Sequence, residues 1–160
     1  MRKGCLLLLL CLCCLCVGAC TPHTDYLAPL RGDFEADVSG ELHGVGFSAL
    51  CLREATTEGV AVTVTFYAPA ALSDTVAKRA PDGSISLSVG EVTVSAAPEG
   101  IAPLFELFSP TGEVISTALT ESGYTEVQCN GFTLTLLPDG TPYLLQTPVA
   151  KATVIRFTPK

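Results

Sequence analysis

A two-residue alternation of apolar and polar side chains runs through most of the chain and constrains its fold more than any other feature. It is clearest in GVAVTVTFYAP, residues 59–69, where Val62, Val64 and Phe66 alternate with threonines. Successive side chains of a strand point to opposite faces, so this period indicates strands with one buried face. Because the other face carries Ser and Thr, the pattern predicts an antiparallel sheet and not a parallel α/β core.

About nine such strands are expected, joined by short turns. The period changes at residues 99–108, where Ile101, Leu104, Phe105 and Phe108 have the spacing of one helical face. Pro103 is compatible with this helix if it lies in the first turn. A long antiparallel sheet must curl or close. We therefore expect a mainly β fold with one or two short helices: a curved antiparallel sheet, or half-barrel, with the helix on its concave face.

The N-terminal residues have the three-part layout of an export signal. Arg2 and Lys3 precede an apolar run that ends in small residues, and six of the eight cysteines lie within residues 5–20. These cysteines lack the spacing and the polar neighbours of a metal site. The sequence VGAC at 17–20 resembles the lipobox of bacterial lipoproteins, which implies cleavage before Cys20 and attachment of lipid to its sulfur. An ordinary signal peptide is the alternative.

This interpretation divides the chain into a lipoprotein signal peptide (1–19), a tether (20–31) and a single β-rich domain (32–160). It places the protein on the extracytoplasmic face of a bacterial membrane, either in the outer leaflet of the cell membrane or in the periplasm of a two-membrane host. Without residues 1–19, the chain has seven Lys and Arg against sixteen Asp and Glu, a formal net charge of −9. Such an acidic protein is not expected to bind nucleic acid, and it would contact anionic lipid through its anchor.

Cys51 and Cys129 are the two cysteines that remain after Cys20. In an exported protein, two such thiols are candidates for a disulfide, and the alternation places both on inward faces. Two free, buried cysteines are the alternative.

Two segments carry a resemblance to a known family: DFEADVSGELHGVGFSALCLRE, residues 33–54, and GVAVTVTFYAPAALSDTVAKRAPDGSISLSVGEVTV, residues 59–94. Their order of strands, with an aromatic-x-x-Pro-like strand end and a later hairpin, resembles the LolA/LolB/LppX-type lipoprotein carriers. The resemblance implies an unclosed antiparallel barrel whose concave apolar face, covered by helices, holds acyl chains.

We therefore expect a lipid or another apolar ligand to bind in the concavity of the sheet. The residues expected to line it are large and inward-facing: Phe47, Phe66, Leu104, Phe105 and Phe108. The alternative is a non-catalytic envelope interaction or assembly module in which the same residues fill the core, with a protein partner that the sequence does not identify. We expect no catalytic residues, metal or cofactor, because the sequence contains no nucleophile elbow, P-loop or H-E-x-x-H motif.

Overall fold

The computed structural model describes residues 24–95 and 98–160. The predicted signal peptide and Cys20 therefore lie outside the described residues. The strands are β1 (Phe34–Leu42), β2 (Val45–Thr56), β3 (Gly59–Ala68), β4 (Thr75–Arg79), β5 (Ile85–Val89), β6 (Val92–Ser95), β7 (Val114–Leu119), β8 (Thr125–Cys129), β9 (Phe132–Leu136), β10 (Pro142–Gln146) and β11 (Ala150–Pro159). Two helices, α2 (Ala28–Arg31) and α3 (Pro98–Phe108), and a 3-10 turn, η1 (Ala70–Leu72), complete the described elements.

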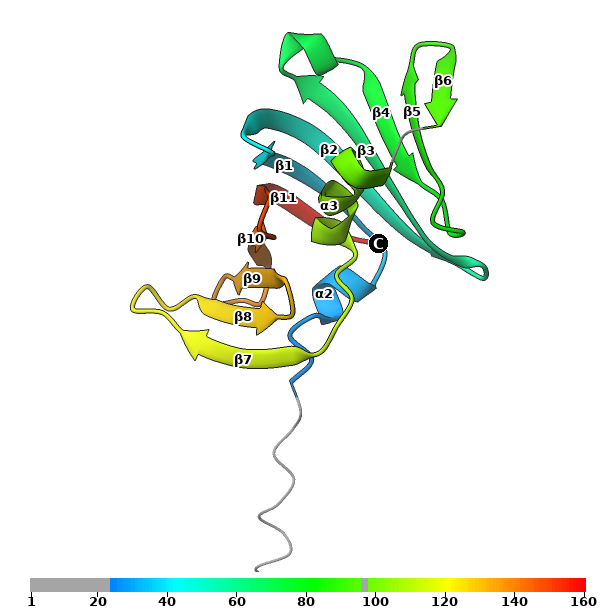
Figure 1. Ribbon diagram of the computed structural model, residues 1–160. Helices are drawn as coiled ribbons and strands as arrows, with labels where there is room; N and C mark the ends of the chain where they lie inside the picture. Colours follow the sequence, from blue (N-terminus) through cyan, green and yellow to red (C-terminus); the bar gives the residue numbers. More distant parts are fainter. Residues whose placement is uncertain (1–23, 96–97) are drawn as a thin grey trace, which may run out of the picture.

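All eleven strands belong to one antiparallel sheet, in the order β6-β5-β4-β3-β2-β1-β11-β10-β9-β8-β7. The predicted fold class is confirmed: the sheet is curved and unclosed, and the helices are few and short (Figure 1). About nine strands were expected, and the described residues form eleven. At the β1–β2 turn, His43 and Gly44 both have a positive φ, of 50° and 82°, as a type I′ hairpin requires.

The order of the strands consists of two meanders that meet in the middle. Strands β1 to β6 extend the sheet in one direction, and β11 back to β7 extend it in the other. The first and last strands pair along nine residues of β1, from Phe34 opposite Pro159 to Leu42 opposite Ala150. Because β6 and β7 are consecutive in the chain but lie at opposite edges, the segment between them must cross the sheet.

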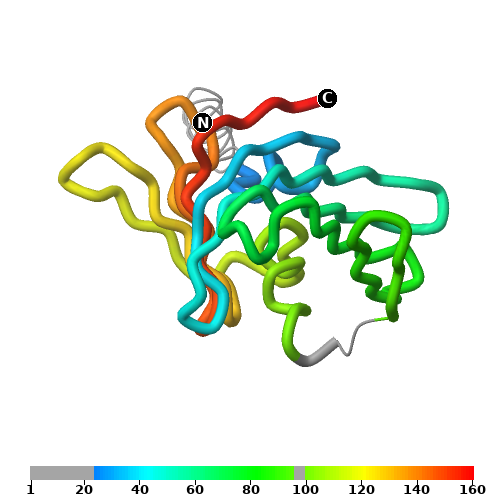
Figure 2. The backbone as a smooth tube through the Cα atoms, turned by 90° about the horizontal axis from the view of Figure 1, so that it is seen from above, coloured from blue at the N-terminus to red at the C-terminus, as the bar shows by residue number. Residues whose placement is uncertain are grey.

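Helix α3 makes this crossing on the concave face (Figures 1 and 2). It contacts β1, β10 and β11 near the centre of the sheet. Helix α3 spans Pro98–Phe108, so Pro103 lies inside it and not in its first turn. A proline there cannot donate its main-chain hydrogen bond, and the burial of the apolar face of α3 offsets that loss.

The core lies between α3 and the concave face of the sheet. Its largest side chains with under 2% exposure are Phe34, Phe105, Phe108, Leu27, Leu30, Leu104, Leu107, Leu134, Leu145, Val38, Val62 and Val64. Leu27 and Leu30 come from α2 and the residue before it, so the segment 27–31 packs against the domain. The expectation that the tether extends to residue 31 is therefore corrected, because the two leucines are three residues apart and share a buried helical face. Within residues 24–95 and 98–160, no helix is long and apolar enough to cross a membrane.

The predicted disulfide is not formed. Cys51 and Cys129 are both buried, as the alternation indicated, but both are free thiols. Cys51 lies on β2 and Cys129 ends β8, with β1, β11, β10 and β9 between these two strands. A disulfide requires Cα atoms within about 7 Å, so sharing the inward face is not sufficient when four strands intervene.

Candidate functional site

An apolar pocket lies at the end of the sheet where β1 turns into β2, and we call it the rim pocket. Its volume is about 310 Å³. It is lined by Leu42, His43, Val45, Phe47, Phe66, Leu72, Thr75, Leu87, Gly100 and Ile101. The lining comes from strands β1 to β5, from η1 and from the first turns of α3, so the pocket lies between the concave face and the crossing helix.

The wall of the rim pocket is hydrocarbon, apart from one hydroxyl and one imidazole. Phe47 and Phe66 meet edge to face with their ring centroids 5.8 Å apart, an arrangement favoured by the ring quadrupoles. Thr75 is buried beside them, and His43 lies in the β1–β2 turn. Val45 begins β2 and is 57% exposed, so it lies at the mouth of the pocket.

The structure divides the five residues that were expected to contact a ligand into two groups. Phe47 and Phe66 line the rim pocket and are each 5% exposed. Leu104, Phe105 and Phe108 have no exposed surface and belong to the packed core beneath α3. Their helical spacing correctly placed them against the sheet, but it did not distinguish filling the core from lining a cavity.

Arg79 packs over one of these core rings. Its guanidinium lies 5.7 Å from the centroid of Phe105, within the range of a cation–π contact. Desolvation lowers the pKa of Arg79, and the nearby carboxylate of Glu106 opposes that shift. The contact joins α3 to β4, whose residue Thr75 lines the rim pocket, and so it helps to hold the helix over the site.

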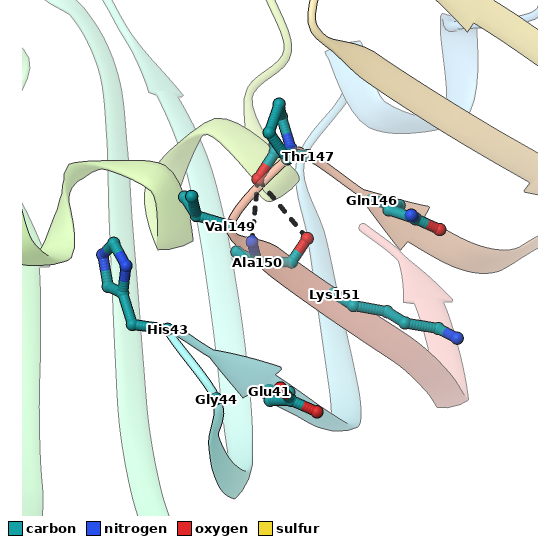
Figure 3. A pocket seen from close by; sticks show the side chains of 9 residues that line it. Glu41, His43, Gly44, Gln146, Thr147, Val149, Ala150 and Lys151 are labelled. Carbon is teal, nitrogen blue, oxygen red and sulfur yellow. Dashed lines mark hydrogen bonds between the residues drawn. The ribbon is translucent and has the colours of Figure 1, made fainter.

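A polar groove shares the lining residue His43 with the rim pocket (Figure 3). It is lined by Glu41, His43, Gly44, Gln146, Thr147, Pro148, Val149, Ala150 and Lys151. Thr147 stabilises the turn between β10 and β11, since its Oγ1 accepts a hydrogen bond from the Ala150 N–H at 3.1 Å. The main-chain N–H of His43 donates to Val149 O at 2.9 Å, which links the two turns. His43 thus lies between an apolar pocket and a polar groove.

Arg53 was not identified from the sequence as a site residue. It is only 5% exposed, and its Nη1 donates to the carbonyl oxygens of Arg31 and Gly32, each at 2.7 Å. Its Nε is buried and has no hydrogen-bond partner among the residues that the structure describes. Desolvation lowers the pKa of Arg53, opposed by the charge of Asp33. The sequence did indicate that Arg53 faces inward, because it lies two residues after Cys51 and therefore on the same face of the strand.

Among the described residues, no group of three or more His, Cys, Asp or Glu is arranged to hold a metal ion. No protein-family model matches the sequence. No curated protein matches it either.

The fold is similar to that of solved structures. The crystal structure of MucB superimposes with a TM-score of 0.52 and 13% sequence identity, over 88% of this chain and 60% of MucB. MucB in complex with MucA(peri) gives a TM-score of 0.45 and 14% identity, over 85% and 55% of the two chains. An uncharacterized conserved protein from Thermus thermophilus gives 0.45 and 14%, over 84% and 83%. At 13% identity the likeness to MucB establishes a shared fold alone, and this chain spans 60% of the length of MucB.

Proposed function

We propose that this chain is a lipid-anchored extracytoplasmic protein that binds an apolar ligand in the rim pocket, without catalysis. The observation that carries the proposal is the apolar pocket of about 310 Å³ between the concave sheet and α3. Ligand pockets are typically concave, mostly apolar and about 300–1,000 Å³ in volume. The rim pocket is at the small end of that range, which favours a single acyl chain or a ligand of similar size.

The lining also favours a ligand with an apolar body. Burying hydrocarbon against Phe47, Phe66 and Leu87 releases water from both surfaces, and this gain grows with the apolar area covered. Thr75 and His43 offer few polar groups to fix an orientation. The affinity is therefore expected to follow the length of the apolar chain more than the chemistry of the headgroup.

The anchor rests on the lipobox-like sequence at 17–20. A lipid on Cys20 would hold the acidic domain at a membrane surface that its charge does not favour. Replacing Cys20→Ala in the full chain tests this part. We expect the protein to move from the membrane fraction to the soluble fraction of the cell envelope, and continued sedimentation with membranes would contradict the anchor.

A second candidate function is a non-catalytic interaction module with a filled core. It is favoured by Leu104, Phe105 and Phe108, which are completely buried beneath α3. In that case the rim pocket would be a packing defect at the end of the sheet and would show no preference for a ligand.

Binding of a fluorescent fatty acid, 11-(dansylamino)undecanoic acid, distinguishes the two candidate functions. The probe is titrated into the full chain, and its fluorescence is measured at a detergent concentration too low for micelles to take up the probe. We expect saturable binding that Val45→Asp weakens by about tenfold, because a carboxylate at the mouth must be desolvated. Val89→Asp is the matched control, since Val45 and Val89 are both 57% exposed and only Val45 lines the pocket. Equal binding by the two variants, or no saturable binding, would favour the filled-core module.

A further inference from the structure

Strand β7 is an open edge of the sheet. It is the last strand in the order, so only β8 pairs with it. All six of its residues are exposed, with Ile115 at 69% and Leu119 at 76%. Natural edge strands are usually protected by charged residues, proline or short length, and the sequence VISTAL of β7 contains no charged residue and no proline. Its one irregularity is a break in register between Val114 and Ser116, which leaves Ser116–Leu119 as the regular part of the edge.

The register of the β7–β8 hairpin identifies the main-chain groups that face outward. Beyond the strand ends, the Thr120 N–H donates to Tyr124 O at 2.8 Å, which makes 120 and 124 a hydrogen-bonded pair. Bonded and non-bonded pairs alternate along an antiparallel ladder, so Leu119 opposite Thr125 and Thr117 opposite Val127 are non-bonded pairs. The N–H and C=O groups of Thr117 and Leu119 therefore point away from β8, toward the open edge.

The stretch of sequence that contains this edge carries only acidic charges. Residues 80–150 contain eight Asp and Glu and no Lys, Arg or His. Glu113 and Glu121 flank β7, and Glu126 lies on β8 opposite Ala118. If a second copy paired antiparallel about Thr117, Glu113 of each chain would lie opposite Glu121 of the other. Like charges directly opposite each other destabilise a strand pair, so the edge fits a cationic strand better than it fits itself.

We propose that β7 binds an extended segment of a partner protein as a twelfth strand, and that this segment has alternating apolar residues flanked by Lys or Arg. Main-chain hydrogen bonds to Thr117 and Leu119 provide the affinity, as in other β-strand additions. The basic flanks meet Glu113 and Glu121 and select the segment. The other edge, β6, spans only Val92–Ser95 and offers a shorter ladder.

Two labelled peptides test the proposal on the full chain in detergent by fluorescence anisotropy: KTVTVTVK and its charge-reversed counterpart ETVTVTVE. We expect the lysine peptide to bind at least about tenfold more tightly, with an affinity that falls as potassium chloride is raised. The double variant Glu113→Gln and Glu121→Gln should remove most of the difference between the peptides. Equal affinity of the two peptides for the unaltered chain would overturn the proposal.

Backbone variants locate the site. Thr117→Pro removes an N–H that faces the open edge and leaves the ladder to β8 intact, so it should weaken binding of the lysine peptide by about tenfold. Thr93→Pro is the matched control on β6: Val92 pairs with Val89 across a two-residue turn, so the Thr93 N–H also faces outward. Thr117→Lys, which keeps the N–H and adds a repelling cation, is the second variant if the proline variant does not fold.

The results have distinct meanings. Loss of binding in the Thr117 variants but not in Thr93→Pro supports the β7 edge. Unchanged binding in both Thr117 variants overturns it. Sedimentation of the unaltered chain as a dimer that Thr117→Pro converts to a monomer also overturns it, because the occupant of the edge would then be a second copy.

Discussion

Arg53 Nη1 lies 2.7 Å from the carbonyl oxygens of both Arg31 and Gly32, so one side chain of β2 closes the end of α2 against the sheet. Carbonyl groups at the end of a helix have no partner within the helix. A guanidinium is well suited to two of them, because its donors are fixed in a plane. Leu27 and Leu30, which are buried against the domain, lie in the same segment.

Replacing Arg53→Leu should lower the free energy of unfolding by about 2 kcal/mol, because charge-assisted hydrogen bonds are lost and two carbonyl groups are left unpaired. Urea unfolding followed by circular dichroism measures the change. Arg156→Leu is the control: Arg156 is exposed and pairs with Asp37 at 2.7 Å on the surface, where an ion pair contributes little. Equal losses in the two variants would show that Arg53 has no special role.

Gly40 on β1 has no room for a side chain. A Cβ atom there would run into the main-chain oxygen of Lys151 and approach Phe47 Cζ and Ala152 Cα to 3.0 Å. We expect Gly40→Ala to cost about 2 kcal/mol through overpacking, and to weaken binding of the fatty acid probe by displacing Phe47. Gly46→Ala is the control, since its Cβ would lie 3.9 Å from the nearest atom, Gly40 O. If thermal unfolding moves equally in both variants, the crowding at Gly40 is relieved by small shifts.

The two buried thiols should be unreactive in the folded protein. Burial raises the pKa of Cys51, opposed by the charge of Arg53, and burial also raises the pKa of Cys129. The thiolate is the reactive form, so iodoacetamide at mildly alkaline pH should modify neither residue until the chain is unfolded by denaturant. Peptide mapping by mass spectrometry gives the result for each cysteine. A disulfide-linked pair of peptides containing both cysteines would contradict the structure.

Two turns of the same sequence type should make stability depend on acidity. Asp82 accepts hydrogen bonds from the N–H and Oγ of Ser84, and Asp139 accepts one from the N–H of Thr141. These bonds favour the carboxylate and lower the pKa of both residues from 3.8. Because the folded-state pKa is depressed, the contribution to stability is complete above pH 3.8 and is lost as pH falls through the lower folded-state values.

The double variant Asp82→Asn and Asp139→Asn keeps an acceptor oxygen but cannot titrate. We expect its unfolding midpoint in urea to fall less steeply than that of the unaltered chain as pH decreases from about 6 to about 3. A comparison at neutral pH gives the effect of the substitution itself. Parallel curves for the two proteins would mean that these turns do not contribute to acid sensitivity.

The local features of the fold were predictable because each is recorded in a short stretch of sequence. The alternation in β3 predicts a half-buried strand whatever its neighbours are, and the spacing of Leu104, Phe105 and Phe108 predicts a helix lying on a sheet. Features that depend on distant pairing were not predictable. Cys51 on β2 and Cys129 on β8 are separated by four strands, which prevents a disulfide between them. No local pattern in the sequence shows this separation.

The candidate site was half predictable for the same reason. Phe47 and Phe66 were expected to face the concavity, and they do line the rim pocket. The alternation continues from Cys51 to Arg53, so the inward position of a charged residue was present in the sequence. The partners of Arg53 are the main-chain carbonyl groups of Arg31 and Gly32. Every residue has such a group, so the sequence does not show which of them Arg53 contacts.

The pairing of β1 with β11 also determines when the fold can be completed. A chain that emerges N-terminus first can build the meander from β1 to β6 early, but the inner edge of β1 stays unpaired until Ala150–Pro159 arrives. Contacts between segments so far apart in sequence are slow to form. Until β11 is available, the strands therefore form two separate half-sheets with four open edges.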